Sequence, residues 1–112
     1  WGRVRETGKT GFKAWLVQEL KARFPGCLIV HQDPNNTHQG IPDLLILHNC
    51  HWAMLEVKGA YNSKQQPNQE YWVRAYNEMA YCSFVYPENV EDVLDEIQQA
   101  LQPHRRARIS QR

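Results

Sequence analysis

The sequence predicts a small α/β domain in which helices pack on a mixed central sheet, with the element order α-β-β-β-α-β-α. Three observations lead to this prediction. Apolar residues recur at helical spacing in three segments, four short apolar runs lie between them, and Pro or Gly residues separate several of these segments. A chain of 112 residues with 42% hydrophobic and 22% charged residues also matches one ordinary globular domain, which excludes a two-domain enzyme.

The first half of the chain predicts one helix and three strands. The helix covers residues 9–24, ends at the Pro-Gly pair 25–26, and has an apolar stripe formed by Phe12, Trp15, Leu16, Leu20 and Phe24. Residues 27–31 predict the first strand, and a loop of turn-forming residues follows it. Residues 44–47 and 52–58 predict two more strands, and the connection between them is short enough for a hairpin.

The second half predicts a helix, a strand and a last helix. The middle helix is expected to begin near Pro67 and to reach about Tyr81, because apolar residues recur at Trp72, Val73, Tyr76 and Met79/Ala80. Residues 82–86 predict the fourth strand. Asn89 is the expected N-cap of the last helix, whose core face carries Val90, Val93, Leu94, Ile97 and Leu101. We expect a core of about residues 9–102 within a single domain of residues 1–112, followed by a basic tail over residues 103–112.

The net charge of +1 alone argues against a nucleic-acid-binding protein, but the distribution of charge argues for one. Residues 1–24 carry six basic and two acidic side chains, residues 25–103 carry three and ten, and residues 104–112 carry four and none. Half of the central acids are expected on the solvent face of the last helix: Glu88, Glu91, Asp92, Asp95 and Glu96. The residues predicted to contact phosphates are Lys9, Lys13, His38, Arg105, Arg106 and Arg108.

The sequence is unlike that of a membrane-spanning protein or of a secreted protein with a disulfide framework. No stretch of 18 apolar residues occurs, so no membrane span is predicted, and we find no charged-then-apolar leader. The three cysteines are an odd number and lie far apart, which favours reduced thiols over a secreted disulfide framework. We therefore expect a cytoplasmic protein.

Two carboxylates and an ammonium are predicted to meet at one end of the hairpin. Glu56 and Lys58 share a face because side chains alternate along a strand, and Asp43 stands just before the partner strand, so the hairpin brings it close to both. Such a cluster of hard oxygen ligands suits Mg²⁺ or Mn²⁺. Hydrolysis of a phosphodiester requires a metal to activate water and a cation to orient it, and Lys58 fits the second role. The structural alternative is a salt bridge between Glu56 and Lys58 at the end of the strand, with Asp43 as an acid of the turn.

Two polar residues on apolar helix faces extend this cluster. Glu19 follows Phe12 by about two helical turns, and it either approaches the metal with Asp43 and Glu56 or pairs with Arg23 four residues on. Gln69 precedes the buried stripe of the middle helix, where it either holds a water or a phosphate oxygen near the site or caps the helix.

The segments Gly40-Ile-Pro-Asp-Leu-Leu45 and Leu55-Glu-Val-Lys-Gly59, together with Gln69, resemble the PD-(D/E)XK nuclease superfamily. Within it they are most similar to the virus-type replication-repair nuclease (VRR-NUC) domain, over about residues 10–100. The resemblance implies a small restriction-endonuclease-like fold and a metal-dependent nuclease. It also implies residue roles. The catalytic residues are Asp43, Glu56, Lys58 and Gln69, which matches the glutamine that opens the helix after the catalytic strand. The metal ligands are Asp43, Glu56, the Val57 carbonyl and Glu19.

The same resemblance implies a homodimer that cleaves branched DNA such as four-way junctions with Mg²⁺ or Mn²⁺. A flap or nicking nuclease of the same class and a catalytically silent DNA-binding module are the alternatives. A third alternative, a small zinc-stabilised domain, rests on the His48, Cys50 and His51 group. Zinc ligands usually come as two separated pairs, and only one such group is present, so a polar hairpin tip explains these residues better.

Overall fold

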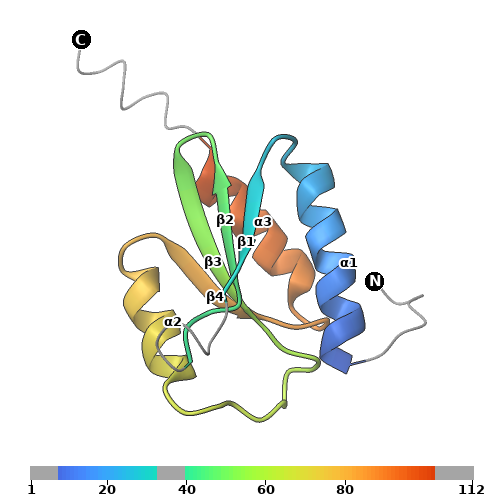
Figure 1. Ribbon diagram of the computed structural model, residues 1–112, viewed down its shortest axis with the longest axis vertical. Helices are drawn as coiled ribbons and strands as arrows, with labels where there is room; N and C mark the ends of the chain where they lie inside the picture. Colours follow the sequence, from blue (N-terminus) through green and yellow to red (C-terminus); the bar gives the residue numbers. More distant parts are fainter. Residues whose placement is uncertain (1–7, 33–39, 103–112) are drawn as a thin grey trace.

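The computed structural model describes residues 8–32 and 40–102, which contain three helices and four strands (Figure 1). In chain order these are α1 (Gly8–Arg23), β1 (Leu28–His31), β2 (Leu44–His48), β3 (His51–Val57), α2 (Gln69–Asn77), β4 (Tyr81–Val85) and α3 (Val90–Leu101). The order confirms the predicted α-β-β-β-α-β-α arrangement. Every strand begins and ends within one residue of its predicted bounds.

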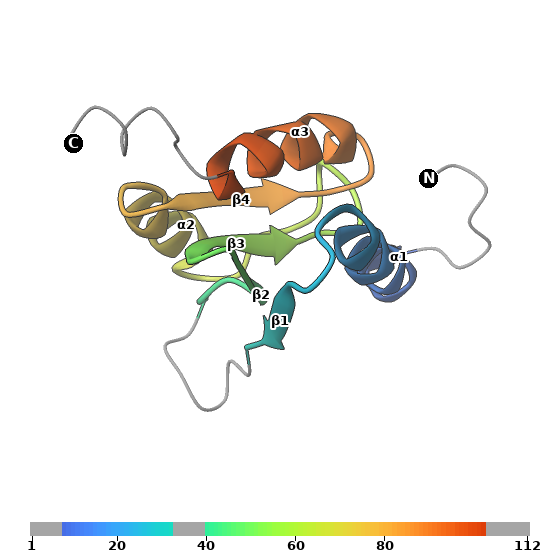
Figure 2. The same ribbon diagram turned by 90° about the horizontal axis from the view of Figure 1, so that it is seen from above.

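The four strands form one mixed sheet in the order β1-β2-β3-β4. Strands β1, β2 and β3 are antiparallel neighbours, whereas β4 runs parallel to β3. A parallel pair needs a crossover connection, and residues 58–80, which include α2, provide it. The mixed sheet that the sequence predicts is therefore confirmed, and Figure 2 shows α3 lying along β4.

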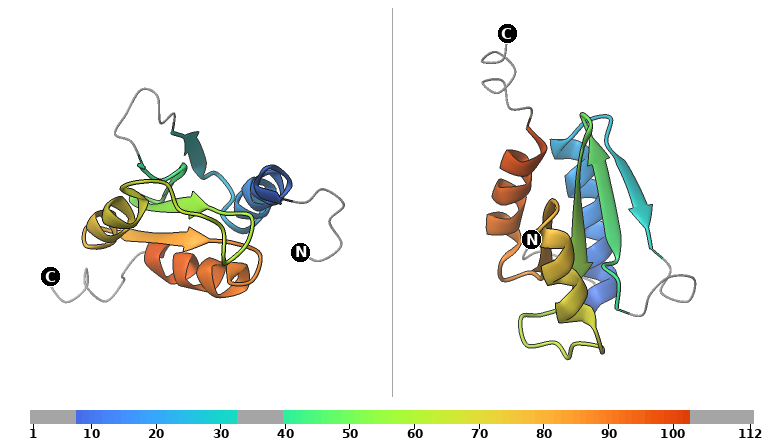
Figure 3. Two further views of the ribbon diagram at one scale, coloured as in Figure 1. Left: turned by 90° about the horizontal axis from the view of Figure 1, so that it is seen from below. Right: turned by 90° about the vertical axis from the view of Figure 1, so that its left-hand side faces the viewer.

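The two faces of the sheet have different coverings. Ala53, Leu55 and Val57 of β3 belong to the hydrophobic core, to which α1 and α3 contribute their apolar stripes. Because side chains alternate along a strand, Trp52 and Glu56 point to the other face, where the ring of Trp52 meets that of Tyr76 from α2 edge-on. In the right-hand view of Figure 3, α3 and β1 lie on opposite sides of the central strands.

The acidic side chains at the last helix are all exposed, as predicted: Glu88, Glu91, Asp92, Asp95 and Glu96. Helix α3 packs on β3 and β4 through the core face, so its own acids, Glu91, Asp92, Asp95 and Glu96, lie across the sheet from Glu56, whereas Glu88 accepts from the Tyr61 N–H at 3.2 Å. The four acids of α3 therefore do not face a negatively charged partner bound at the Glu56 face of the sheet.

Helix α2 is shorter than the spacing of apolar residues predicts. It begins at Gln69 because Asn68 has a left-handed backbone with φ of 70°, which leaves Pro67 outside the helix. At the other end, the N–H groups of Met79 and Ala80 both donate to the Tyr76 carbonyl and close a turn. The Met79 side chain is exposed, so its helical spacing does not reflect burial against a core, and the prediction of a helix to Tyr81 is wrong.

Asn89 takes the predicted N-cap position of α3 but not the expected hydrogen bond. Its side chain makes no capping hydrogen bond to the helix. Instead, Oδ1 accepts from the Tyr86 N–H at 2.9 Å and Nδ2 donates to the Phe84 carbonyl at 3.2 Å. Asn89 thus ties the end of β4 to the turn that precedes α3.

The β2–β3 hairpin turns through two residues with left-handed backbones, Asn49 with φ of 52° and Cys50 with φ of 66°. This is the pattern of a type I′ turn, in which Gly is the preferred second residue. Cys50→Gly is expected to raise the free energy of unfolding by about 0.5–1 kcal/mol, because it removes the cost of a Cβ in a left-handed conformation. Urea denaturation measures the change. Cys50→Ala keeps that cost and serves as control; an equal gain in both variants would assign the effect to loss of the thiol.

None of the helices within residues 8–32 and 40–102 has the length and apolar character needed to cross a bilayer. All three cysteines are unpaired: Cys27 is half-buried, Cys50 is exposed and Cys82 is buried. Burial raises the pKa of the Cys82 thiol to about 12, and the negative charge of Glu56 adds to this rise.

Candidate active site

Backbone pairing places Asp43 opposite Glu56. Leu44 pairs with Leu55, and the ladder continues past the end of β2, where the Val57 N–H donates to Asp43 Oδ2 at 3.0 Å. On its other side, the Asp43 carbonyl accepts from the Gln32 N–H at 2.8 Å. Because the N–H and the carbonyl of one strand residue point to the same side of the strand, the Val57 carbonyl faces the Asp43 side as well. Register alone therefore fixes the first predicted carboxylate beside the second.

Glu56 is a buried acid with one unsatisfied oxygen. Only 1% of the residue is exposed. Its Oε2 accepts from Gln69 Nε2 at 2.7 Å, whereas Oε1 is buried with no hydrogen-bond partner in the described part of the chain. Burial raises the pKa of Glu56 to about 7, and the nearby Asp43 charge adds to the rise. A buried acid with an unsatisfied oxygen is typical of a functional site, where a ligand or an ion binds that oxygen.

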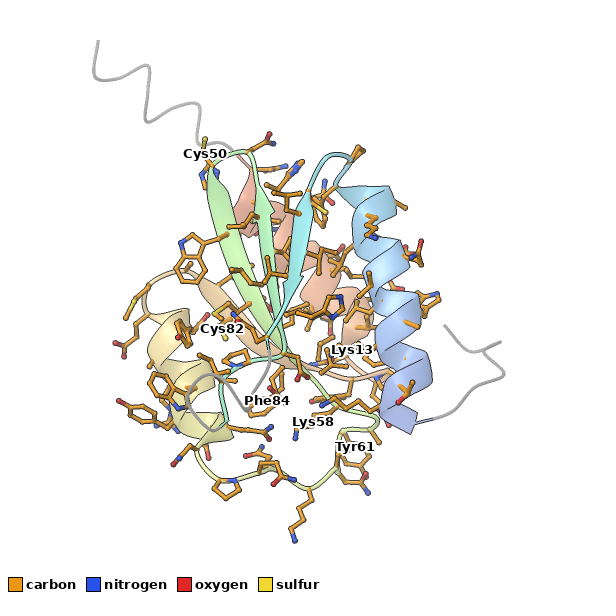
Figure 4. All side chains as sticks on the ribbon, viewed as in Figure 1. Lys13, Cys50, Lys58, Tyr61, Cys82 and Phe84 are labelled. Atoms are coloured by element: carbon orange, nitrogen blue, oxygen red, sulfur yellow. The ribbon has the colours of Figure 1, made fainter. Side chains whose placement is uncertain are left out.

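Lys58 lies beside Glu56 on the same face of the sheet, as the two-residue period predicts. Its Nζ donates to Gln69 Oε1 at 2.6 Å and to the Lys64 carbonyl at 3.2 Å, and it lies 3.8 Å from Glu56 Oε2. Burial lowers the pKa of Lys58 below its usual value, while the charge of Glu56 acts in the opposite direction. In Figure 4, Lys58 lies at the end of the sheet opposite Cys50, away from the hairpin tip.

Gln69 joins the acid and the ammonium through a single amide group. Its Nε2 donates to Glu56, and its Oε1 accepts from Lys58 and from the Gln66 N–H, the latter at 2.8 Å. Gln69 is also the only residue of α2 that is buried. The structure thus gives Gln69 a place in the cluster, and its hydrogen bonds hold the Glu56 and Lys58 side chains in fixed orientations.

The segment that leads to Asp43 begins with Gly40, and the structure gives a steric reason for a glycine there that the sequence alone does not show. Gly40 has φ of +87°, and a Cβ at this position would lie 2.6 Å from the Pro67 carbonyl oxygen and 2.9 Å from the Gln69 nitrogen. Only a glycine lets the chain before Asp43 lie against the start of α2. Gly40 therefore sets the position of the helix from which Gln69 reaches the cluster.

A second glycine performs the same task for α1. A Cβ on Gly59 would lie 3.0 Å from the Lys9 nitrogen, in the first turn of that helix. This approach puts Lys9 at the cluster, where its Nζ lies 3.2 Å from Asp43 Oδ2. The sequence predicts Lys9 as a phosphate contact, but no pattern in it indicates this ion pair.

Glu19 lies apart from the other predicted metal ligands. It pairs with Arg23, whose Nε donates to Glu19 Oε2 at 2.9 Å, and Arg23 also reaches Glu91 at 3.4 Å. Glu19 follows Lys9 by ten residues, which correspond to about 15 Å along a helix. Of the two alternatives that the sequence leaves open for Glu19, the structure contains the ion pair. The cluster consists of Asp43, Glu56, Lys58 and Gln69, with Lys9 at its edge.

The donor set of the cluster suits a hard divalent cation. Among residues 8–32 and 40–102, no three His, Cys, Asp or Glu residues lie close enough together to hold a metal, so neither Glu19 nor the His48, Cys50 and His51 group completes such a set. Two carboxylates remain, one with a buried unsatisfied oxygen, and a backbone carbonyl on the same side. Mg²⁺ is commonly held by one or two carboxylates together with water and substrate phosphate, and this set fits that pattern.

The predicted phosphate contacts fall into two groups. Lys9 and Lys13 line a cavity of about 490 Å³ that also borders Thr10, Ala14, Val17, Gln18 and His31. His38, Arg105, Arg106 and Arg108 lie outside the described residues. The described basic residues thus flank the cluster on its α1 side.

No protein-family model matches the sequence, and no curated protein matches it. A solved structure described as "VRR_NUC domain" is similar to this chain, with a TM-score of 0.55 and 24% sequence identity over 73% of this chain and 92% of that chain. This similarity shows that the chain has the fold of such a domain, and it confirms the fold that the sequence motifs imply.

Proposed function

We propose that this chain, which has the fold of a VRR-NUC domain, is a single-domain endodeoxyribonuclease that depends on Mg²⁺ or Mn²⁺. The observation that carries the proposal is the buried Glu56 carboxylate, whose unsatisfied Oε1 lies in one cluster with Asp43 and Lys58. A buried carboxylate oxygen without a hydrogen-bond partner is costly, and a cation at this oxygen would offset that cost.

Asp43, Glu56 and the Val57 carbonyl would hold the cation, and Glu19 stays paired with Arg23. A bound divalent cation supplies polarisation of a phosphate oxygen and a lower pKa for an attacking water. Lys58 contributes a positive charge whose position is fixed by Gln69, so it orients the water or offsets charge that develops on the phosphate. Gln69 acts as a positioning residue for both Glu56 and Lys58.

Branched DNA, such as a four-way junction, is the substrate that we propose, and the active form is a two-fold dimer in the cytoplasm. Each chain carries one cluster, and a symmetric junction that is cut in two strands needs two clusters related by a two-fold axis. Lys9 and Lys13 beside the cluster, with His38, Arg105, Arg106 and Arg108, would supply phosphate contacts. A flap or nicking nuclease would use the same cluster on one strand.

Cleavage of labelled DNA with metal tests the proposal. Wild-type protein is expected to cut a four-way junction faster than a flap or a linear duplex in Mg²⁺ or Mn²⁺, and to cut nothing in EDTA. Lys58→Met is expected to lower the rate about 100- to 1000-fold, because it removes a fixed cation from the reacting phosphate. Rates from a denaturing gel and the molar mass from light scattering are the measurements.

Lys21→Met is the matched control, because Lys21 is an exposed lysine in the last turn of α1. It is expected to cut at the wild-type rate. DNA binding without any metal-dependent cleavage would identify a silent binding module instead of a nuclease. Equal rates on all three substrates would contradict the junction preference, and a monomer that makes paired cuts would contradict the dimer.

A further inference from the structure

The Lys9 ammonium lies at one of the carboxylates that the proposed function assigns to the metal. Its Nζ lies 3.2 Å from Asp43 Oδ2, on the carboxylate that we assign to the metal. The Lys9 side chain is 46% exposed and that of Asp43 is 16% exposed, so the pair is weak and open to solvent on the lysine side. The metal-free chain therefore supplies its own counter-ion to Asp43.

The backbone of Lys9 is held in place, whereas its side chain is about half exposed to solvent. Gly59 directly follows Lys58, and its close approach to the Lys9 nitrogen fixes the start of α1 at the cluster. The lysine side chain is a flexible stem of four carbons that ends in the ammonium. A change of rotamer alone therefore moves the ammonium without moving the helix.

The α1 cavity offers the Lys9 ammonium a second location. Lys9 lines the cavity of about 490 Å³ beside α1, together with Lys13 and His31. This cavity has two lysines and a histidine on its walls and no acidic residue among those that line it. Its charge is suited to a phosphate of a DNA backbone that passes the cluster.

The charge of Lys9 already acts on the two central residues of the cluster. Although burial and Asp43 raise the pKa of Glu56, Lys9 opposes that rise, and after burial Lys9 also contributes to the lowered pKa of Lys58. A divalent cation held by Asp43 and Glu56 would lie next to this ammonium, and the two like charges repel. The ammonium and the cation thus compete for Asp43.

We propose that Lys9 couples metal binding to DNA binding, an inference that rests on the proposed function. Without metal, its ammonium is held by Asp43. Metal at the Asp43–Glu56 pair displaces the ammonium into the α1 cavity, where it contacts a backbone phosphate. Lys9 is therefore a competitor of the metal in the free protein and a ligand of the substrate in the loaded one.

Calorimetric titration with Mn²⁺ tests the competition without any measurement of cleavage. Lys9→Met is expected to bind Mn²⁺ about three- to tenfold more tightly than wild type, and the gain is expected to shrink as salt screens the lysine charge. Lys13→Met is the matched control, because Lys13 lines the same cavity but has no ion pair with Asp43. It is expected to bind Mn²⁺ with wild-type affinity.

Fluorescence anisotropy with labelled DNA tests the second half of the coupling, in a Lys58→Met background that prevents cleavage. Mn²⁺ is expected to strengthen DNA binding several-fold less in Lys9→Met than in the Lys9-containing parent. Lys13→Met is expected to weaken DNA binding by the same factor with and without Mn²⁺. Thermal melting of each variant confirms that it is folded.

The outcomes separate this inference from the proposed function. Equal Mn²⁺ affinities of wild type and Lys9→Met would overturn the coupling and leave the nuclease intact. Absence of Mn²⁺ binding by wild type would overturn both. An equal gain in affinity for Lys9→Met and Lys13→Met would overturn the specific competition, because it would show a general effect of net charge.

Discussion

Glu56→Gln is expected to abolish metal-dependent cleavage and at the same time to make the metal-free protein more stable. Glu56 is 1% exposed and one of its carboxylate oxygens has no hydrogen-bond partner. An amide of the same shape carries no charge to bury, so the variant loses the metal ligand and also the cost of the buried charge. Activity and stability move in opposite directions, as is common for residues of active sites.

The stability gain depends on pH in a defined direction. Burial, followed by the charge of Asp43, raises the pKa of Glu56 from 4.5 to about 7. Between these values the folded protein keeps a proton that the unfolded chain has lost, so wild-type stability falls as pH rises from about 4.5 to about 7 and then levels off. The total loss from this group is about 3 kcal/mol. The amide does not titrate, so Glu56→Gln matches wild type near pH 4 and exceeds it by up to about 3 kcal/mol at pH 8.

Urea denaturation at pH 4, 6 and 8 in EDTA measures this difference. Glu78→Gln, on an exposed glutamate after α2, is the control and is expected to follow wild type within about 0.5 kcal/mol at each pH. Added Mg²⁺ is expected to stabilise wild type at pH 8 but not Glu56→Gln, because only the folded wild type binds it. A Glu56→Gln protein that is less stable than wild type at pH 8 would show that the buried carboxylate is well solvated or paired.

Gly40→Ala is expected to lower the free energy of unfolding by about 3 kcal/mol and cleavage by about 100-fold. The left-handed backbone of Gly40 costs an alanine about 1 kcal/mol. The added Cβ would also lie 2.6 Å from the Pro67 carbonyl oxygen, so the start of α2 must move. Gln69 moves with it, and an error of about 1 Å in a positioning group can reduce a rate by about two orders of magnitude.

Gly26→Ala separates the two causes. Gly26 has nearly the same backbone, with φ of +89°, but a Cβ there meets nothing within 4 Å. It is expected to lose only about 1 kcal/mol in urea denaturation and to keep wild-type cleavage. Equal losses in the two variants would mean that backbone conformation alone explains Gly40, and that α2 is free to adjust.

The part of the site that was predictable follows from the geometry of strands. The two-residue period puts Glu56 and Lys58 on one face, and the antiparallel hairpin puts Asp43 beside them, as the register of β2 and β3 confirms. Both rules act over neighbouring residues, so a single sequence contains the information. The exposure of the acids of α3 was predictable for the same reason. The apolar stripe takes the face of the helix that packs on the sheet, so the acids lie on the solvent face.

The rest depends on contacts between distant elements. The left-handed Asn68 and the exposed Met79 shorten α2, and neither is visible in the spacing of apolar residues. Whether Glu19 meets the metal or Arg23 depends on how far α1 extends past the cluster. Lys9 reaches Asp43 from the start of α1, which packs closely against Gly59, fifty positions away in the sequence.

The crossover helix α2 also determines how the protein opens. Helix α2 buries only Gln69, and its apolar side chains Trp72, Val73 and Tyr76 are half-buried, whereas α1 and α3 each bury five residues. Segments with few buried apolar contacts are the first to unfold locally. Transient release of α2 would hydrate Glu56 and free Lys58 while the hydrophobic core under α1 and α3 stays closed. The dry environment of the cluster therefore depends on the helix of the described fold that buries the fewest residues.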